Sequence, residues 1–184
     1  GDCFFMACEG IEVIRATRME TLAYPRLMTP LTLAGKRLRN RVVHASMTTL
    51  LAENARVSDR LLRYYGNRAR GGAAMIVSEP VAMSASFDQP NRVRAWNDDA
   101  VEGLKRWADT VESADCRLLG QIVDRGRGRN LPGRSYDGIG ASVLPDDLSW
   151  SVPRELGAAE IRHLVAEFAE GALRDFIDGK LAGI

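Results

Sequence analysis

Polar side chains follow or interrupt three short apolar stretches of the sequence, and they are the groups best suited to do chemistry. Residues 46–49 (Ser-Met-Thr-Thr) follow the first stretch, 79–80 (Glu-Pro) follow the second, and Gln121 lies inside the third. Hydroxyl, carboxylate and carboxamide groups donate and accept hydrogen bonds, so these residue types can recognise a polar ligand. Gln121 is the most informative, because a buried amide must find partners for its carbonyl and its NH₂ group. Neighbouring backbone could supply those partners, and Thr48 could equally cap a turn.

The three apolar stretches predict β-strands at 41–45, 73–78 and 117–123. The second stretch, AAMIVS, is apolar without alternation, which is typical of a strand that is buried on both faces. The polar groups that could bind a ligand therefore follow or lie within strands of a buried sheet.

Amphipathic helices are predicted between and after these strands. Ser58 is a suitable N-cap for a first helix, which Gly71 or Gly72 would end. A second helix is predicted over 98–114, and a third over 158–173 after a long loop. Five apolar residues at helical spacing define one face of the third helix: Ile161, Leu164, Val165, Phe168 and Ala172.

The repeated order of strand and helix predicts an α/β fold with a parallel sheet and right-handed crossovers. A βα barrel and a doubly wound sheet both fit this order. In either fold, ligands bind beyond the carboxyl ends of the strands. This rule nominates residues 46–49, 79–80 and 121–127 as the candidate site.

Length and charge limit the classes of partner. A chain of 184 residues predicts a single domain, and 25 Lys and Arg against 24 Asp and Glu create no overall field that would attract nucleic acid. The Arg- and Gly-rich stretch 125–134 has no aromatic pair for stacking on bases, so it predicts a solvated loop. The apolar runs are too short to span a bilayer, so no transmembrane helix is predicted.

The cysteines and histidines predict neither disulfides nor a metal site. Cys3, Cys8 and Cys116 are odd in number and form no Cys-x-x-Cys pair, which indicates a reducing cytoplasm. His44 and His163 are isolated from each other and from the cysteines, and neither a metal site nor a nucleophilic triad can be assembled.

The first residues of the chain differ in character from the rest. Residues 1–18 lack the basic start and the cleavage site of a secretory signal. We interpret them as a non-native or mis-assigned extension, and residues 19–184 as the part that carries the fold.

Three sequence segments together resemble a known family. RNRVVHASMTT, VSDRLLRYYGNRARGGAAMIVSEP and LLGQIVDRGR are similar, in order and spacing, to the amino-terminal half of the Old Yellow Enzyme family of FMN-dependent oxidoreductases. The resemblance is strongest to the branch that includes bacterial dienoyl-CoA reductases, and it runs from about Tyr24 to Arg174. It implies a βα barrel, of which about three units are present here, because a complete barrel takes roughly 250 residues.

The resemblance also implies a cofactor and its contacts. FMN would lie at the carboxyl ends of the strands, against Ser46, Met47, Thr48, Pro80 and Gln121. A hydroxyl such as that of Thr48 would hydrogen-bond the flavin C4 carbonyl, and the amide of Gln121 would meet the pyrimidine edge.

Three positions depart from the family pattern. The family commonly has Pro where Ser46 stands and a small residue where Pro80 stands, and Pro80 offers no backbone N–H to a flavin. Asp124 replaces a histidine of the branch's Gln-apolar-x-His-x-Gly-Arg pattern.

The resemblance implies an FMN-dependent oxidoreductase that takes hydride from NADH or NADPH and reduces a small-molecule activated alkene. The histidine-containing pair that ends the family's fourth strand has no counterpart, since the chain reads DFIDGKLAGI there, so the catalytic residues stay unknown. The alternative is a truncated, inactive barrel fragment that acts only through self-association or partner binding. Uncovered apolar strand faces predict a homo-oligomer in either case.

Overall fold

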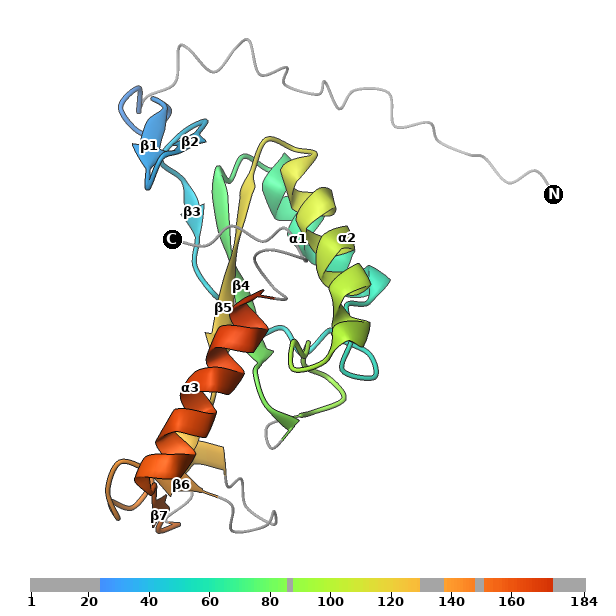
Figure 1. Cartoon of the computed structure of the whole chain (residues 1–184). Helices are drawn as coiled ribbons and strands as arrows, with labels where there is room; N and C mark the ends of the chain where they lie inside the picture. Colours follow the sequence, from blue (N-terminus) through green and yellow to red (C-terminus); the bar gives the residue numbers. More distant parts are fainter. Residues whose placement is uncertain (1–23, 86–87, 130–137, 148–150, 174–184) are drawn as a thin grey trace, which may run out of the picture.

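Three parallel strands form the centre of the chain (Figure 1). They are β3 (Val43–His44), β4 (Met75–Ala82) and β5 (Arg117–Val123), in the sheet order β3-β4-β5. The computed structural model confirms the bounds predicted for the third strand, whereas the first strand is shorter than predicted and the second is longer.

The structure describes residues 24–85, 88–129, 138–147 and 151–173. Four of our interpretations concern residues outside this part of the chain: the extension 1–18, the cysteines at 3 and 8, the Arg at 134, and the sequence at 175–184. They stay predictions.

β4 contains a β-bulge at the residues that we predicted to lie in a loop. The register between β4 and β5 shifts between Val77 and Pro80, and Pro80 pairs with Gln121 beyond the shift. Proline has no N–H for the ladder and is tolerated inside a sheet only at such irregularities. The backbone N–H of Gln121 donates instead to the Ser78 hydroxyl, at 2.9 Å. Residues 79–80 therefore lie within β4, because the bulge lets the strand continue through a proline.

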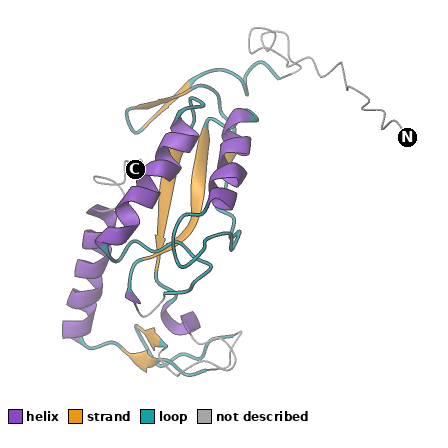
Figure 2. Cartoon of the chain, turned by 90° about the vertical axis from the view of Figure 1, so that its right-hand side faces the viewer, coloured by secondary structure: helices purple, strands orange, loops and turns teal. Residues whose placement is uncertain are grey.

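Two helices cover one face of the sheet. α1 (Asp59–Arg70) begins after the predicted N-cap Ser58, whose hydroxyl accepts a hydrogen bond from Leu61 N at 3.2 Å. α2 (Val101–Glu112) follows a turn of 3-10 helix, η3 (Asp98–Ala100). Figure 1 shows both helices on the same side of β4 and β5, and Figure 2 looks onto that side. Right-handed crossovers between strands in sequential order place helices on one face, as in a barrel, whereas a doubly wound sheet covers both faces.

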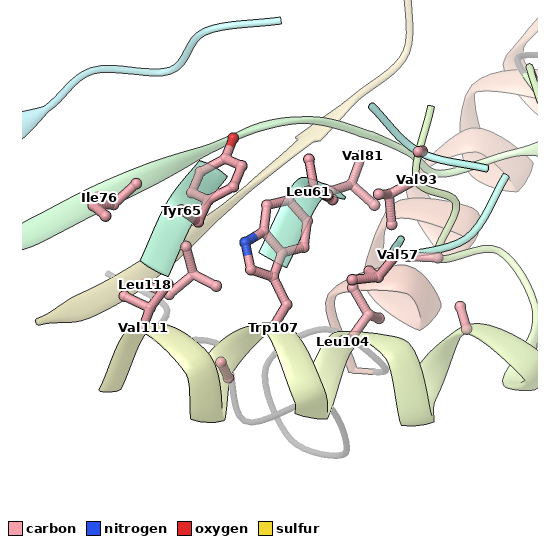
Figure 3. Packing of buried hydrophobic residues seen from close by; sticks show 14 of the residues in the cluster. Val57, Leu61, Tyr65, Ile76, Val81, Val93, Leu104, Trp107, Val111 and Leu118 are labelled. Carbon is pink, nitrogen blue, oxygen red and sulfur yellow. The ribbon is translucent and has the colours of Figure 1, made fainter. Parts of the chain in front are cut away.

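The core lies between these helices and the sheet. Tyr65 of α1 and Trp107 of α2 pack edge to face, with ring centroids 4.8 Å apart (Figure 3). Five apolar side chains that are completely buried surround the two rings: Leu61, Ile76, Leu104, Val111 and Leu118. Both helices therefore bury one apolar stripe against the sheet, as their sequence spacing predicts.

The basic lead into β3 binds the end of α1. The guanidinium of Arg39 donates to the carbonyl oxygens of Ala69 and Ala73, at 2.6 and 2.9 Å. Asn40 Nδ2 donates to the carbonyl of Gly72 at 2.9 Å. A cation and an amide are suited to the carbonyls at a helix C-terminus, where the negative end of the helix dipole lies. These contacts fix where β3 starts, and hence the position of residues 46–49, which follow its carboxyl end.

α3 (Ala158–Ala172) matches its predicted range, but its apolar face is only partly covered. Phe168 packs against the core, whereas Ile161 is 47% exposed and Val165 is 64% exposed. The apolar spacing of this face is therefore only partly matched by burial, because no described element packs over Ile161 and Val165.

Two small sheets lie outside the predicted pattern. β1 (Leu31–Leu33) and β2 (Lys36–Leu38) form a hairpin whose turn, Ala34-Gly35, has positive φ angles of 46° and 75°. A hairpin turn of this kind favours Asn or Gly at both positions, so the alanine obscures the signal.

The second small sheet lies in the segment that we predicted to be a loop. β6 (Ile139–Gly140) and β7 (Arg154–Glu155) pair in parallel beyond η4 (Gly126–Arg129), with Arg154 N donating to the carbonyl of Gly138 at 2.9 Å. Strands of two residues are too short to produce a recognisable alternation of apolar and polar residues.

Candidate functional site

The predicted site residues meet at the carboxyl ends of the three strands. Ser46 follows β3, Pro80 lies in β4 and Gln121 lies in β5. The Ser46 hydroxyl donates a hydrogen bond to Oε1 of Gln121, and it reaches across the intervening strand β4 to do so. Side chains that are 75 positions apart in sequence therefore belong to one cluster.

Several groups of this cluster are open to a ligand. Met47 is 56% exposed, and Thr48 and Gln121 are exposed as well. Our premise that Gln121 is a buried amide is therefore wrong: its strand neighbours are half-buried, and its side chain extends from the uncovered face of the sheet. Within the described residues, Nε2 of Gln121 has no hydrogen-bond partner.

Glu79 forms the buried centre of the site, at 2% exposure. Its Oε2 accepts hydrogen bonds from the backbone N–H and the hydroxyl of Thr49, at 2.7 and 2.5 Å. The second carboxylate oxygen, Oε1, is buried and has no hydrogen-bond partner in the described part of the chain. One acidic side chain of β4 thereby ties down the segment that follows β3.

Tyr65 connects this centre to the core. Its hydroxyl, which points away from Trp107 in Figure 3, accepts a hydrogen bond from the backbone N–H of Glu79 at 2.6 Å. Burial raises the pKa of Tyr65, and the nearby negative charge of Glu79 raises it further. The phenol therefore stays protonated and neutral, and it serves as a hydrogen-bonding group.

Asp124 has a local structural role in the loop after β5. Its Oδ1 accepts a hydrogen bond from Gly126 N at 2.7 Å, and Gly126 has a φ of +51°. Arg127 donates to the carbonyl of Pro145 at 2.8 Å. The residue that stands in place of the branch's histidine thus stabilises the turn at the start of the Arg- and Gly-rich stretch.

The described histidines and cysteine form no catalytic group with one another. His44 Nε2 accepts a hydrogen bond from Arg68 Nε at 3.1 Å, and burial together with that guanidinium lowers the pKa of His44. His163 is exposed beside Glu167, and Cys116 is buried. Among the described residues, no group of three or more His, Cys, Asp or Glu side chains could hold a metal ion.

Comparison with known proteins identifies the family. The sequence profile of the NADH:flavin oxidoreductase / NADH oxidase family matches residues 26–179. The chain belongs to this family. FMN and NAD(P)H are the cofactors that this membership supports, and it confirms the resemblance drawn from the three segments. The dienoyl-CoA reductase branch stays a prediction.

Curated relatives match over most of this chain. An aldehyde reductase, FrzD, from Cladobotryum sp is 33% identical over 164 residues, which are 86% of this chain and 44% of that protein. An NADPH dehydrogenase from Bacillus cytotoxicus is 27% identical over 152 residues, or 81% of this chain and 43% of that protein. The chain thus spans less than half the length of these relatives.

Solved structures show the same fold. Morphinone reductase, at 26% identity, superposes with a TM-score of 0.71 over 86% of this chain and 47% of its own. The old yellow enzyme from Trypanosoma cruzi, at 23% identity, superposes with a TM-score of 0.74 over 88% and 50%. The three strands therefore correspond to part of a βα barrel, as predicted, and the described strands do not close into one.

No helix in the described residues is long and apolar enough to cross a membrane.

The sequence indicated the ends of the strands but not the buried links between them. Glu79 and Thr49 were noted only as parts of the polar stretches at 79–80 and 46–49, and nothing indicated that they bond to each other. An acidic residue between an apolar run and a proline is the signal that could have suggested a buried carboxylate at a bulge.

Proposed function

We propose that this chain forms the FMN-binding, amino-terminal part of an NAD(P)H-dependent oxidoreductase of the ene-reductase type. The observation that carries the proposal is the exposed amide of Gln121, joined to the Ser46 hydroxyl at the carboxyl ends of the strands. Ligands of βα barrels bind at these ends. The substrate would be a small molecule with an activated alkene.

The side chains present fit the polar edge of a flavin. That edge carries carbonyl acceptors on both sides of an N–H donor. Gln121 offers two N–H donors, and its Oε1 can accept a second hydrogen bond besides that from Ser46. Thr48 adds an exposed hydroxyl, whereas Pro80 adds no backbone donor. The cluster therefore fits the cofactor, with one donor fewer than a chain with a small residue at position 80.

When bound, FMN supplies hydride transfer from reduced nicotinamide to an alkene. The residues of this chain would bind and orient it: Gln121 through the amide, Thr48 through the hydroxyl, and Met47 through its exposed apolar side chain. No described residue is assigned a role in the chemical step. The cytoplasmic location indicated by the cysteines is part of this proposal.

Titration of the purified chain with FMN tests the proposal through quenching of flavin fluorescence. Gln121→Ala should weaken binding by about 1–3 kcal/mol, or about 5- to 150-fold in Kd, because the amide's hydrogen bonds are lost. Asn67→Ala is the matched control, since it removes an exposed amide of α1 whose one partner among the described residues is Arg70. A folded wild-type chain that binds no FMN at high micromolar concentration would overturn the proposal.

Self-association is the second candidate function, and the exposed apolar side chains favour it. Ile161 and Val165 of α3 and Val43 of β3 are all exposed. Apolar surface of this kind favours contact with another copy of the chain. Size-exclusion chromatography with light scattering should show a dimer or larger species, and a monomer that binds FMN would leave only the first proposal.

A further inference from the structure

Glu79 lies where the three segments of the candidate site meet. Its carboxylate binds Thr49 after β3, its chain neighbour Pro80 is a predicted cofactor contact, and its carbonyl accepts a hydrogen bond from Ser78, at 2.8 Å. The same Ser78 hydroxyl accepts from the backbone N–H of Gln121, at 2.9 Å. Three of the predicted flavin contacts, Thr48, Pro80 and Gln121, are therefore within one or two links of this residue, and Ser46 is joined to it through Gln121.

We propose that Glu79 is a positioning residue, which holds segment 46–49 in the conformation that faces the flavin. This inference rests on the proposed function, because it concerns the geometry of the same site. Glu79 itself need not touch the cofactor, since it is buried and acts through Thr49.

The conformation of the segment after β3 shows why it needs an anchor. Leu50 has a φ of +57°, in the left-handed region that is unfavourable for a residue with a branched side chain. On one side of it, Thr49 donates two hydrogen bonds to Glu79. On the other side, Leu51 N donates to the Thr49 hydroxyl at 3.3 Å. The carboxylate thus stabilises a turn that would otherwise relax and displace residues 46–48.

Burial of Glu79 is poorly explained by stability alone. Its Oε1 is buried without a hydrogen-bond partner among the described residues, and such an acceptor destabilises a fold. An apolar residue in β4 would avoid that cost but could not bind Thr49. The need to hold the turn at Leu50 in its left-handed conformation explains why a carboxylate, which can bind Thr49, stands at this position.

Paired variants separate the hydrogen bonds from the bulk of the side chains. Thr49→Val removes the hydroxyl at nearly constant shape, and Glu79→Ala removes the carboxylate. Both should raise the Kd for FMN about tenfold or more. Thr49→Ser and Glu79→Gln keep a donor and an acceptor, so both should stay within about threefold of wild type. Thr110→Val is the matched control, since it removes a hydroxyl of α2 whose one partner in the described part of the chain is the carbonyl of Arg106.

Affinities are measured well below each variant's melting transition, so that loss of folded protein does not contribute. A role limited to stability would lower the melting temperature and leave the Kd of the folded chain unchanged. If Glu79→Ala fails to fold, the comparison of Thr49→Val with Thr49→Ser still decides. Equal Kd values for wild type and Thr49→Val would overturn this inference alone, whereas a wild-type chain without FMN binding would overturn the proposed function and this inference with it.

Discussion

Tyr65→Phe tests whether the core and the candidate site are physically coupled. The Tyr65 side chain is completely buried, and its hydroxyl accepts a hydrogen bond from the backbone N–H of Glu79 at 2.6 Å. Phenylalanine preserves the edge-to-face contact with Trp107 but leaves that N–H without a partner inside the bulge of β4. An unpaired buried donor costs about 1–3 kcal/mol. For a chain of this length, each kcal/mol lowers the melting temperature by roughly 2–4 °C, so a mid-range loss predicts a fall of about 4–8 °C.

Thermal unfolding followed by circular dichroism measures this shift, and Tyr64→Phe is the control. Tyr64 neighbours the same residues, but the structure shows no hydrogen bond from its hydroxyl within the described part of the chain. The control should unfold within about 2 °C of wild type, because surface-proximal changes that break no bond cost little. Equal melting temperatures for the two variants would refute the reasoning, since the Glu79 N–H would then have another partner or stay solvated.

Three further measurements test individual contacts. Ser58→Ala should lower the free energy of unfolding in urea by about 1 kcal/mol, because it removes the N-cap bond to Leu61 N; an unchanged midpoint would mean that water replaces the cap. Burial raises the pKa of Cys116 to about 11, so at pH 8 its thiol should react on the order of 100-fold more slowly in the native than in the unfolded chain; comparable rates would mean that the thiol is accessible. The guanidinium of Arg154, together with the backbone N–H of Gly157, lowers the pKa of Glu160 to about 2, so these contacts favour folding above the ordinary carboxyl pKa and lose that effect as the pH falls from about 4.5 towards 2. NMR titration should find a higher pKa for Glu160 in Arg154→Ala than in wild type, and an unchanged pKa would remove the ion pair from the explanation.

Parts of the site could be predicted from local sequence. The Ser58 cap, the range 117–123 and the helix 158–172 follow from residue types within a few positions, because caps, strand runs and helical spacing depend on nearby neighbours. Motif order predicted that segment 46–49, Pro80 and Gln121 share one end of the sheet. Family membership confirms the βα-barrel fold on which that prediction rests.

Other features depended on contacts between distant residues, and only the tertiary structure decided them. Whether Gln121 was buried depended on what covers its face of the sheet, and the same uncertainty applied to Ile161 of α3; both proved exposed. The link from Glu79 to Thr49 spans 30 positions, and the local sequence around the bulge does not indicate which residue the carboxylate binds. The sequence by itself thus determined the order of the three central strands and the three helices, since these depend on short-range preferences, whereas it gave no sign of the four short strands β1, β2, β6 and β7. The burial of Glu79, the bulge at Pro80 and the single face covered by both helices arise from packing between segments, because burial and hydrogen bonding depend on neighbours that the chain brings together only on folding.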